Sequence, residues 1–195
     1  MVDNLRKILN PLISNIEKTK DIKLKKDIAR KILTKIYQTK DKWLDKAFFE
    51  KEINYGCFYT LRIYLNPNDE YCITIQGWGA HHKTPIHNHD TWSSSITILG
   101  SETQYLHGKI NKPYPKKYAP NDTTKRIFKE GDRIELASTQ LHQVENHTDN
   151  IALSAVFFMK HPNTTNRISV CERSYSVKPW KVVPNKLKID TKRLD

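Results

Sequence analysis

The first 50 residues place their apolar side chains at the three-to-four-residue spacing of amphipathic helices. This spacing predicts two or three helices, and we expect Pro11 to kink or divide the first of them. Asp3 and Asp41 are candidate N-caps for the first and the last helix. Each helix has one apolar stripe, so the segment must cover another layer of the fold. The apolar positions of the two longer helices are Leu5, Ile8, Leu9, Leu12, Ile13, Ile16, Ile28, Ile32, Leu33 and Ile36.

From Gly56 onward the apolar period changes to two, which is the spacing of β-strands. The runs are rich in β-branched and aromatic residues, and turn sequences such as NPND and HTDN separate them. Eight short strands at this spacing predict a small barrel or a double-sheet sandwich. The predicted strands are residues 57–65, 71–78, 93–100, 102–108, 126–131, 133–138, 141–146 and 151–158.

The length of the chain favours a single structural domain. Its 195 residues are enough for one well-buried core and too few for two comfortable ones. Within that domain we expect a helical segment at 1–50 packed on a β-barrel at 51–175. A basic tail at 176–195 follows, and we expect it to lie along the outside of the barrel.

The formal net charge of +12 raises the question of a nucleic-acid or acidic membrane partner. Residues 1–50 carry 13 basic and 7 acidic side chains, residues 159–195 carry 9 and 3, and the stretch between them carries 11 of each. The excess charge therefore belongs to the two ends, where the sequence shows no nucleic-acid-binding motif. We interpret the lysines as solvated helix faces and a basic tail, and holding nucleic acid is the weakest functional alternative.

The three cysteines, Cys57, Cys72 and Cys171, are odd in number and far apart in sequence. This usage argues against a disulfide framework and favours a reducing compartment. The sequence opens without a signal peptide, and its apolar runs are shorter than a membrane span. We therefore expect a soluble cytoplasmic protein whose cysteines are buried as small apolar side chains.

Two histidines one residue apart, His87 and His89, lie in the stretch TPIHNHDTW. Alternate residues of an extended segment point to the same side, so we expect both imidazoles to face the barrel interior. Asn88 and Asp90 should then face away. Two converging imidazoles can share a metal ion, with a third ligand from a strand remote in sequence. His142 is the candidate for that third ligand.

The spacing around these histidines resembles the two sequence motifs of the cupin superfamily. Ala137 and Thr139 replace a proline and a glycine of the second motif, and Ser93 and Ser94 stand where the first motif has a glutamate ligand. The resemblance implies a mainly β fold, the double-stranded β-helix or jelly-roll barrel, with the N-terminal helices layered on it. The matching positions are Gly79, His87, His89 and Gly100 in the first motif and Gly131, His142 and Asn146 in the second.

Three neutral imidazoles without a carboxylate resemble the metal site of the thiol dioxygenases, a cupin family that includes cysteine dioxygenase and 3-mercaptopropionate dioxygenase. The likeness covers most of the strand-rich region and is most specific at Trp78–Gly79 and at PIHNHD, residues 85–90. It implies an enzyme that holds Fe(II) through His87, His89 and His142 and oxidises a small thiol with O2 to a sulfinate. Three neutral ligands leave the charge of the ion uncompensated, which favours an anionic thiolate as a further ligand.

The outer-sphere relay of the thiol dioxygenases, a Ser-x-His-x-Tyr sequence, is matched only in part. Ser154 is retained, whereas Val156 and Phe158 replace the histidine and the tyrosine. Ser154 is thus a remnant of that relay, and proton handling must differ from the usual form of the family. The cysteine that is crosslinked to tyrosine in animal cysteine dioxygenases is replaced by Ser94.

The enzymes of this family bind the substrate carboxylate with an arginine. Two arginines of this sequence are candidates for that role. Arg167 lies nine residues after Phe158, which matches the arginine of 3-mercaptopropionate-type enzymes, and a guanidinium can hold a carboxylate bidentately. The arginine of cysteine dioxygenases would fall at Leu61, and Arg62 is one position away, where a strand points to the opposite face. Arg167 is therefore the preferred anion clamp, with Arg62 and Tyr59 as further candidates for substrate binding.

Two other functions fit the same sequence. One is a metal-dependent cupin oxygenase that acts on a non-thiol small molecule, which the incomplete relay favours. The other is a non-catalytic cupin whose barrel binds a small anion. Oxygen consumption with a non-thiol substrate would indicate the first, and tightly bound metal without oxygen consumption would indicate the second.

Overall fold

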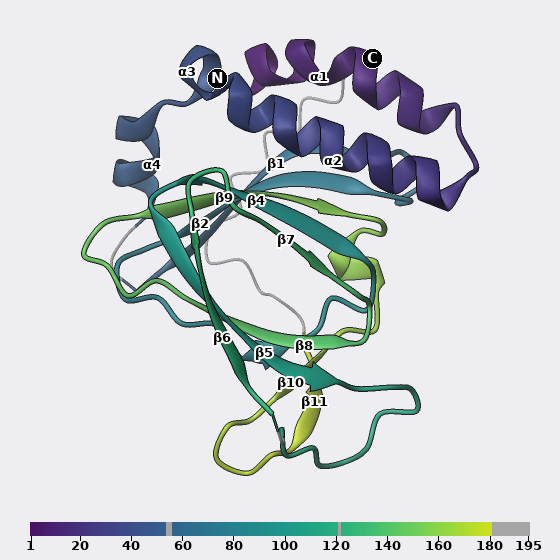
Figure 1. Ribbon diagram of the computed structural model, residues 1–195, viewed down its shortest axis with the longest axis vertical. Helices are drawn as coiled ribbons and strands as arrows, with labels where there is room; N and C mark the ends of the chain where they lie inside the picture. Colours follow the sequence, from purple (N-terminus) through teal and green to yellow (C-terminus); the bar gives the residue numbers. More distant parts are fainter. Residues whose placement is uncertain (54–55, 121, 181–195) are drawn as a thin grey trace.

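The computed structural model describes residues 1–53, 56–120 and 122–180 as two antiparallel β-sheets that face each other, with helices layered on one of them (Figure 1). The first sheet has five strands in the order β1-β2-β9-β4-β7 and the second has six in the order β11-β10-β3-β8-β5-β6. This mainly β arrangement is the double-stranded β-helix that the sequence predicts.

The strands of the first sheet are β1 (Phe58–Leu65), β2 (Cys72–Trp78), β9 (Ala152–Phe158), β4 (Ser93–Leu99) and β7 (Arg133–Leu136). Those of the second sheet are β11 (Val177–Pro179), β10 (Ile168–Val170), β3 (Ile86–His87), β8 (Gln140–Glu145), β5 (Ser101–Lys109) and β6 (Thr124–Lys129). A short 3-10 helix, η1 (Pro162–Thr164), links β9 to β10.

All eight predicted strands are confirmed, but β3, β10 and β11 were not predicted. Each has only two or three residues, too few for an alternation of apolar and polar positions to be visible. β10 pairs with β3 on one side and with β11 on the other. Residues 177–179 of the predicted tail thus form a strand of the sheet, and residues 181–195 lie outside the described residues.

The N-terminal layer has four helices rather than two or three. They are α1 (Val2–Glu17), α2 (Ile22–Gln38), α3 (Lys40–Trp43) and α4 (Lys46–Glu52). Pro11 lies within α1 without dividing it, because a proline removes one backbone hydrogen bond and the flanking turns continue the helix. None of the helices in the described ranges has both the length and the apolar character that a membrane span requires.

The helix caps differ from those that the sequence suggests. Asp3 and Asp41 lie in the first turns of α1 and α3, not at their N-caps. Side-chain caps are instead provided by Asp21, which accepts from the backbone of Lys23 at 2.7 Å, and by Asp45, which accepts from Phe48 at 3.0 Å. An acidic side chain in the first turn still interacts favourably with the helix dipole.

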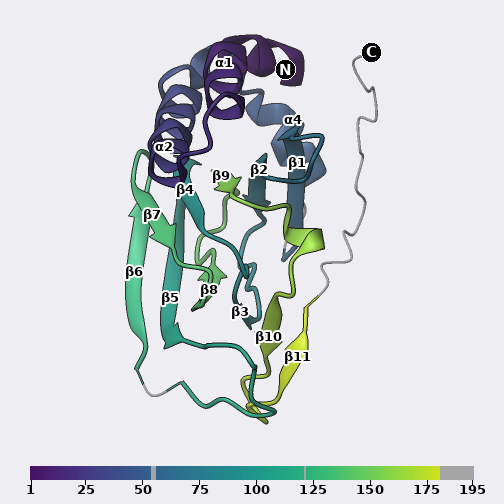
Figure 2. The same ribbon diagram turned by 90° about the vertical axis from the view of Figure 1, so that its right-hand side faces the viewer.

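The largest apolar core lies between the helices and the outer face of the five-stranded sheet, not inside the barrel. Leu9 of α1, Ile32 of α2 and Phe157 of β9 are fully buried in this layer. Figure 1 shows α1 and α2 lying across that sheet, and Figure 2 shows the same layer from the side. Because the main core is placed there, the space between the two sheets does not have to hold it, and smaller apolar clusters and polar side chains share the barrel interior.

The prediction of three buried cysteines is correct for Cys72 and wrong for the other two. Cys57 and Cys171 are exposed, and all three are free thiols. Cys57 precedes β1 and Cys171 follows β10, so neither side chain is enclosed within a sheet.

Candidate metal centre

The two sheets enclose a cavity of about 290 Å³ with polar and apolar side chains in its wall. Strand β1 shows how strand alternation assigns residues to this cavity. Thr60 and Arg62 line it, whereas Tyr59 and Leu61 belong to the core under the helices. Leu61, where the arginine of cysteine dioxygenases would fall, thus points away from the cavity, and Arg62 faces it.

The position of Tyr59 corrects the expectation that this residue contacts substrate. Its ring lies edge-on to Phe48 and Phe49 of α4, at centroid distances of 6.4 and 6.1 Å, and is absent from the cavity wall. Tyr59 and Arg62 are three positions apart in one strand, so their side chains lie on opposite faces. Arg62 and Arg167 both line the cavity.

His87, His89 and His142 come together at one side of the cavity. Their potential ligand atoms lie within 4.8 Å of one another, and the Nε2 atoms of His89 and His142 are 3.1 Å apart. His87 is paired with His142 across β3 and β8. β3 ends at His87, and Asp90 has a positive φ of 53°, so a turn rather than continued strand alternation directs His89 into the group.

Asn88 and Asp90 are absent from the cavity wall, in agreement with the prediction that they face away from the interior, and both make contacts on the other side. Asn88 is fully buried, and its Oδ1 accepts a hydrogen bond from the backbone of Ile168 at 2.9 Å. Asp90 accepts from the Tyr114 hydroxyl at 3.0 Å and forms an ion pair with Lys112 at 2.7 Å. These contacts hold the turn between the two histidines in place.

Each imidazole has its Nδ1 atom engaged, which leaves Nε2 available to a metal. In metal-binding histidines, the hydrogen bond at the ring nitrogen that does not bind the metal determines the tautomer and the ring orientation. Ser93 stands where the resembling motif has a glutamate, and here its hydroxyl contacts the His89 imidazole. The Nδ1 contacts join His87 to the Pro85 carbonyl at 2.9 Å, His89 to Ser93 Oγ at 2.7 Å and His142 to Gln104 Oε1 at 3.0 Å.

Burial keeps the three imidazoles neutral. It lowers the pKa of His87 to about 3, against the hydrogen bond to Pro85 and with the help of the Arg167 charge. Burial also lowers the pKa of His89 and of His142 well below the ordinary value. Neutral imidazole is the form that binds metals such as iron, zinc and copper. The three residues therefore fit a divalent transition-metal ion at neutral pH.

A buried hydrogen-bond chain leads from His142 to a carboxylate that the sequence analysis missed. Gln104 accepts from His142 and donates to Glu102 Oε1 at 2.7 Å. Glu102 Oε2 accepts from Trp78 Nε1 and from Ser154 Oγ, both at 2.8 Å. Burial raises the pKa of Glu102, and these three hydrogen bonds oppose the rise. Ser154, the expected relay remnant, thus contacts Glu102 in this chain.

Replacing Glu102 with glutamine should weaken divalent metal binding about 10-fold to 100-fold, the usual cost of losing a partner behind a metal ligand. An amide cannot accept all three hydrogen bonds, so Gln104 loses its orientation and with it that of His142. Zinc affinity measured by competition with a chromophoric chelator tests this. Glu50→Gln, which removes one charge on the exposed face of α4, is the matched control. Wild-type affinity in the Glu102 variant would contradict the role of this chain.

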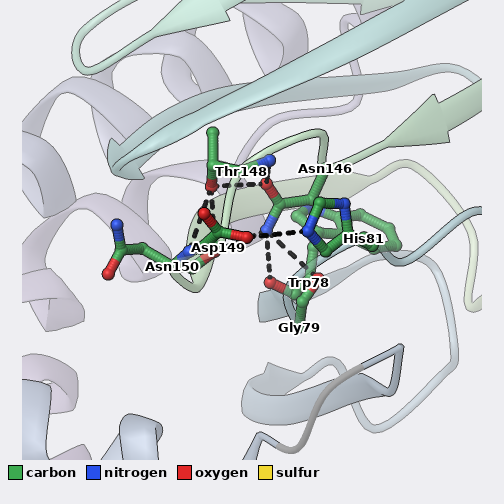
Figure 3. Close-up of polar contacts among 7 residues, drawn as sticks. All are labelled: Trp78, Gly79, His81, Asn146, Thr148, Asp149 and Asn150. Carbon is green, nitrogen blue, oxygen red and sulfur yellow. Dashed lines mark hydrogen bonds and ion pairs between the residues drawn. The ribbon is translucent and has the colours of Figure 1, made fainter.

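Asn146, which stands where the resembling second motif ends, joins the loop that follows β2 to the turn that follows β8 (Figure 3). Its Oδ1 accepts from the backbone and the hydroxyl of Thr148 at 3.0 and 2.8 Å. On the same loops, His81 lies 2.9 Å from Asp149, so His81 belongs to a structural contact. Asn146 Nδ2 donates to the carbonyls of Trp78 (3.0 Å), Gly79 (3.1 Å) and Asn150 (2.7 Å).

Arg167 and Trp180 form the wall of the cavity beside His87. Arg167 is 7% exposed, and its Nε donates to the Trp180 carbonyl at 3.1 Å. The Trp180 ring lies 4.8 Å from the guanidinium carbon and 4.1 Å from the His87 ring centroid. Burial lowers the pKa of Arg167 to about 10, which still leaves it a cation at neutral pH. The predicted anion clamp thus shares the cavity with the three histidines.

Comparison with known proteins finds likeness in structure alone. No known protein family matches the chain, and no curated protein matches it in sequence. One similar solved structure is an oxalate oxidase in complex with the substrate analogue glycolate, at 12% identity over 59% of this chain and 56% of that chain, with a TM-score of 0.46. An RmlC-like cupin family protein with a double-stranded β-helix fold from Methanocaldococcus jannaschii is 16% identical over 55% of this chain and 84% of that chain, with a TM-score of 0.42. A Cupin 2 conserved barrel domain protein from Salinispora arenicola is 18% identical over 53% of this chain and 76% of that chain, with a TM-score of 0.41.

The chain spans a little more than half the length of that oxalate oxidase. The order and pairing of the strands define the fold. Fold and site together define a double-stranded β-helix with a three-histidine candidate metal centre. None of the three structures named is a thiol dioxygenase.

Proposed function

We propose that the protein is an Fe(II)-dependent dioxygenase that oxidises a small, carboxylate-bearing thiol to its sulfinate. One observation carries this proposal: three neutral imidazoles converge on a cavity that also contains the buried cation Arg167. Imidazole suits Fe(II), and three protein ligands leave coordination positions for other molecules. The cavity is also of a size that admits a small molecule.

A ferrous ion held by the three histidines would supply the open coordination positions and the one-electron chemistry that a reaction between a thiol and O2 requires. Arg167 would orient the substrate by pairing with its carboxylate. Phe158 lies edge-on to His89 at 5.0 Å and Val156 lines the same wall. These apolar side chains, with Trp180 beside His87, would keep water away from the sulfur.

The proposed reaction balances without a further reductant. The sulfur of the thiol loses four electrons, O2 gains four, and both oxygen atoms form bonds to sulfur in the sulfinate. The thiol proton is released to solvent. Gln104 and Glu102 would hold the proton on His142 Nδ1 in place, so that His142 presents Nε2 throughout.

An oxygenase that acts on a non-thiol substrate is the second candidate, and the residues around His89 favour it. Val156 and Phe158 offer no titratable group where thiol dioxygenases have their relay. A substrate whose oxidation needs no proton transfer at that wall would be compatible with this arrangement.

Oxygen-electrode assays of the Fe(II)-loaded protein test the proposal. We expect O2 uptake with 3-mercaptopropionate or cysteine, one sulfinate formed per O2 consumed, and little uptake with cysteamine, which has no carboxylate for Arg167. Bound iron without thiol-dependent uptake would reject thiol oxidation. Uptake with a non-thiol substrate would then indicate the second candidate, and none with any compound would indicate a non-catalytic anion-binding protein.

A further inference from the structure

Uncharged polar side chains lie on the inner face of the five-stranded sheet, within the cavity that holds the three histidines. Thr60 of β1 and Gln76 of β2 stand directly opposite each other in the strand pairing, and Thr74 lies two positions before Gln76 on the same face of β2. All three side chains line the cavity. Paired and alternate residues of a sheet lie about 5–7 Å apart, so one small ligand can contact more than one of them.

The hydroxyl group of Thr74 is buried without a hydrogen bond. Thr74 is 6% exposed, and its Oγ1 has no hydrogen-bond partner within the described part of the chain. Buried hydroxyl groups are normally paired, because an unmatched one has lost its water without a replacement. The hydroxyl of Thr60 and the amide of Gln76 likewise make no hydrogen bond to another of the residues that the structure describes. The wall therefore presents hydrogen-bonding groups that a bound molecule could satisfy.

Thr74 lies close to the side chains that contact the metal centre. It is paired with Val156 of β9, and Phe158, two residues further along β9, has its ring 5.0 Å from the His89 ring. Alternate residues of a strand are about 7 Å apart. The side chains of Val156 and Phe158 are apolar and offer Thr74 no hydrogen bond. A molecule held at the three histidines could therefore extend along this wall and place a polar group at Thr74.

The charges near Thr74 favour a neutral ligand group there. Arg62 stands opposite Thr74 in the pairing of β1 with β2. Burial raises the pKa of the neighbouring Cys72 thiol to about 12, and the Arg62 charge lowers that pKa whereas the Asp69 charge raises it. Arg167 also lowers it, and the proposed function assigns the substrate carboxylate to Arg167. Because Asp69 opposes Arg62, a second charged group at Thr74 would lose its hydration for little electrostatic gain, and a hydroxyl group avoids most of that loss.

We propose that the cavity wall at Thr74 binds an uncharged hydrogen-bonding group of the ligand, and that a hydroxyl group fits it best. The identity of the rest of the ligand rests on the proposed function, under which the substrate is a thiol with a hydroxyl group besides its carboxylate, such as 3-mercaptolactate. A ligand hydroxyl can both donate to and accept from the Thr74 hydroxyl. An ammonium group, as in cysteine, can only donate, and its charge would have to be buried.

Calorimetric titration of the anaerobic Fe(II)-loaded protein with 3-mercaptolactate and 3-mercaptopropionate tests the proposal, since these thiols differ by one hydroxyl group. We expect 3-mercaptolactate to bind about fivefold to tenfold more tightly in the wild type. Thr74→Val, which removes the hydroxyl at nearly constant volume, should reduce that ratio to within about twofold and leave 3-mercaptopropionate affinity nearly unchanged. Thr74→Ser keeps a hydroxyl group and should retain the ratio. Cysteine, which needs no variant, should bind the wild type less tightly than 3-mercaptolactate.

Thr124→Val is the matched control, because Thr124 is exposed on β6 and outside the cavity wall. It makes the same chemical change and should leave the ratio of the two affinities unchanged. Equal binding of the two thiols by the wild type would overturn the proposal, as would cysteine binding more tightly than 3-mercaptolactate. A ratio that survives in Thr74→Val would also overturn it, because water would then satisfy Thr74. So would a ratio that is lost in Thr74→Ser as well, because packing rather than the hydroxyl would then be the cause.

The oxygen assay separates failure of this proposal from failure of the proposed function. A preference for 3-mercaptolactate that depends on Thr74, without O2 uptake for this or any other thiol, leaves the hydroxyl-binding site standing and rejects thiol oxidation. Oxidation of 3-mercaptopropionate by a protein that binds both thiols equally keeps the proposed function and rejects the hydroxyl-binding site.

Discussion

Replacing His142 with alanine should lower the affinity for a divalent metal by at least about 100-fold, more than the loss of a partner behind a ligand costs. It should also abolish any oxygen uptake. The variant keeps two of the three imidazoles that could bind the metal. It also removes the imidazole whose Nδ1 atom contacts Gln104 Oε1. Metal content after dialysis, together with the chelator competition, measures the effect.

His147→Ala is the matched control for this experiment. His147 is an exposed histidine five residues further along the chain, in contact with Tyr105 and Glu145 outside the cavity. Its removal should leave metal affinity within about twofold of wild type. A His142 variant that keeps one tightly bound metal per chain would show that the three histidines are not the metal centre.

Replacing Phe157 with alanine should lower the free energy of unfolding by about 3–5 kcal/mol, the usual cost of removing a buried phenylalanine ring. Phe157 is fully buried in the core between the five-stranded sheet and the helices, and its ring stacks on Tyr71 at 5.4 Å. Urea-induced unfolding followed by tryptophan fluorescence measures the change.

Metal affinity should survive in folded Phe157→Ala, because this side chain faces the helices while its neighbour Phe158 faces the cavity. Ile127→Ala serves as the control for stability, since Ile127 is 59% exposed on β6 and should change the free energy of unfolding by less than about 0.5 kcal/mol. A loss below 1 kcal/mol in the Phe157 variant would contradict a main core outside the barrel.

Much of the architecture follows from local patterns in the chain. Among the eight longer strands, β1 and β7 alternate in burial and β9 is a short, nearly continuous apolar run, and both patterns are visible without a structure. α1 and α2 show equally clear apolar stripes. The motif spacing predicts that His87, His89 and His142 form one group, and their potential ligand atoms do lie close together.

Other features depend on contacts between distant residues. β3, β10 and β11 exist because neighbouring strands supply hydrogen-bond partners for two or three residues at a time. The prediction that Tyr59 contacts substrate is wrong, because alternation gives the period of a strand but not which of its faces meets the helices. Glu102 and Gln104 are polar residues two apart within a predicted strand, a signal that could have placed both on an interior face.

By itself, the sequence determined the elements with strong periodicity and the three-histidine set, since both depend on residue types at short, regular spacing. The tertiary structure alone decided what surrounds that set. It brought Glu102 behind His142, Trp180 beside His87, and Arg62 with Thr74 onto the wall that Arg167 shares. These residues come from separate strands and chain ends, and only the closure of two sheets around a common cavity places their charges and hydrogen bonds within reach of one another.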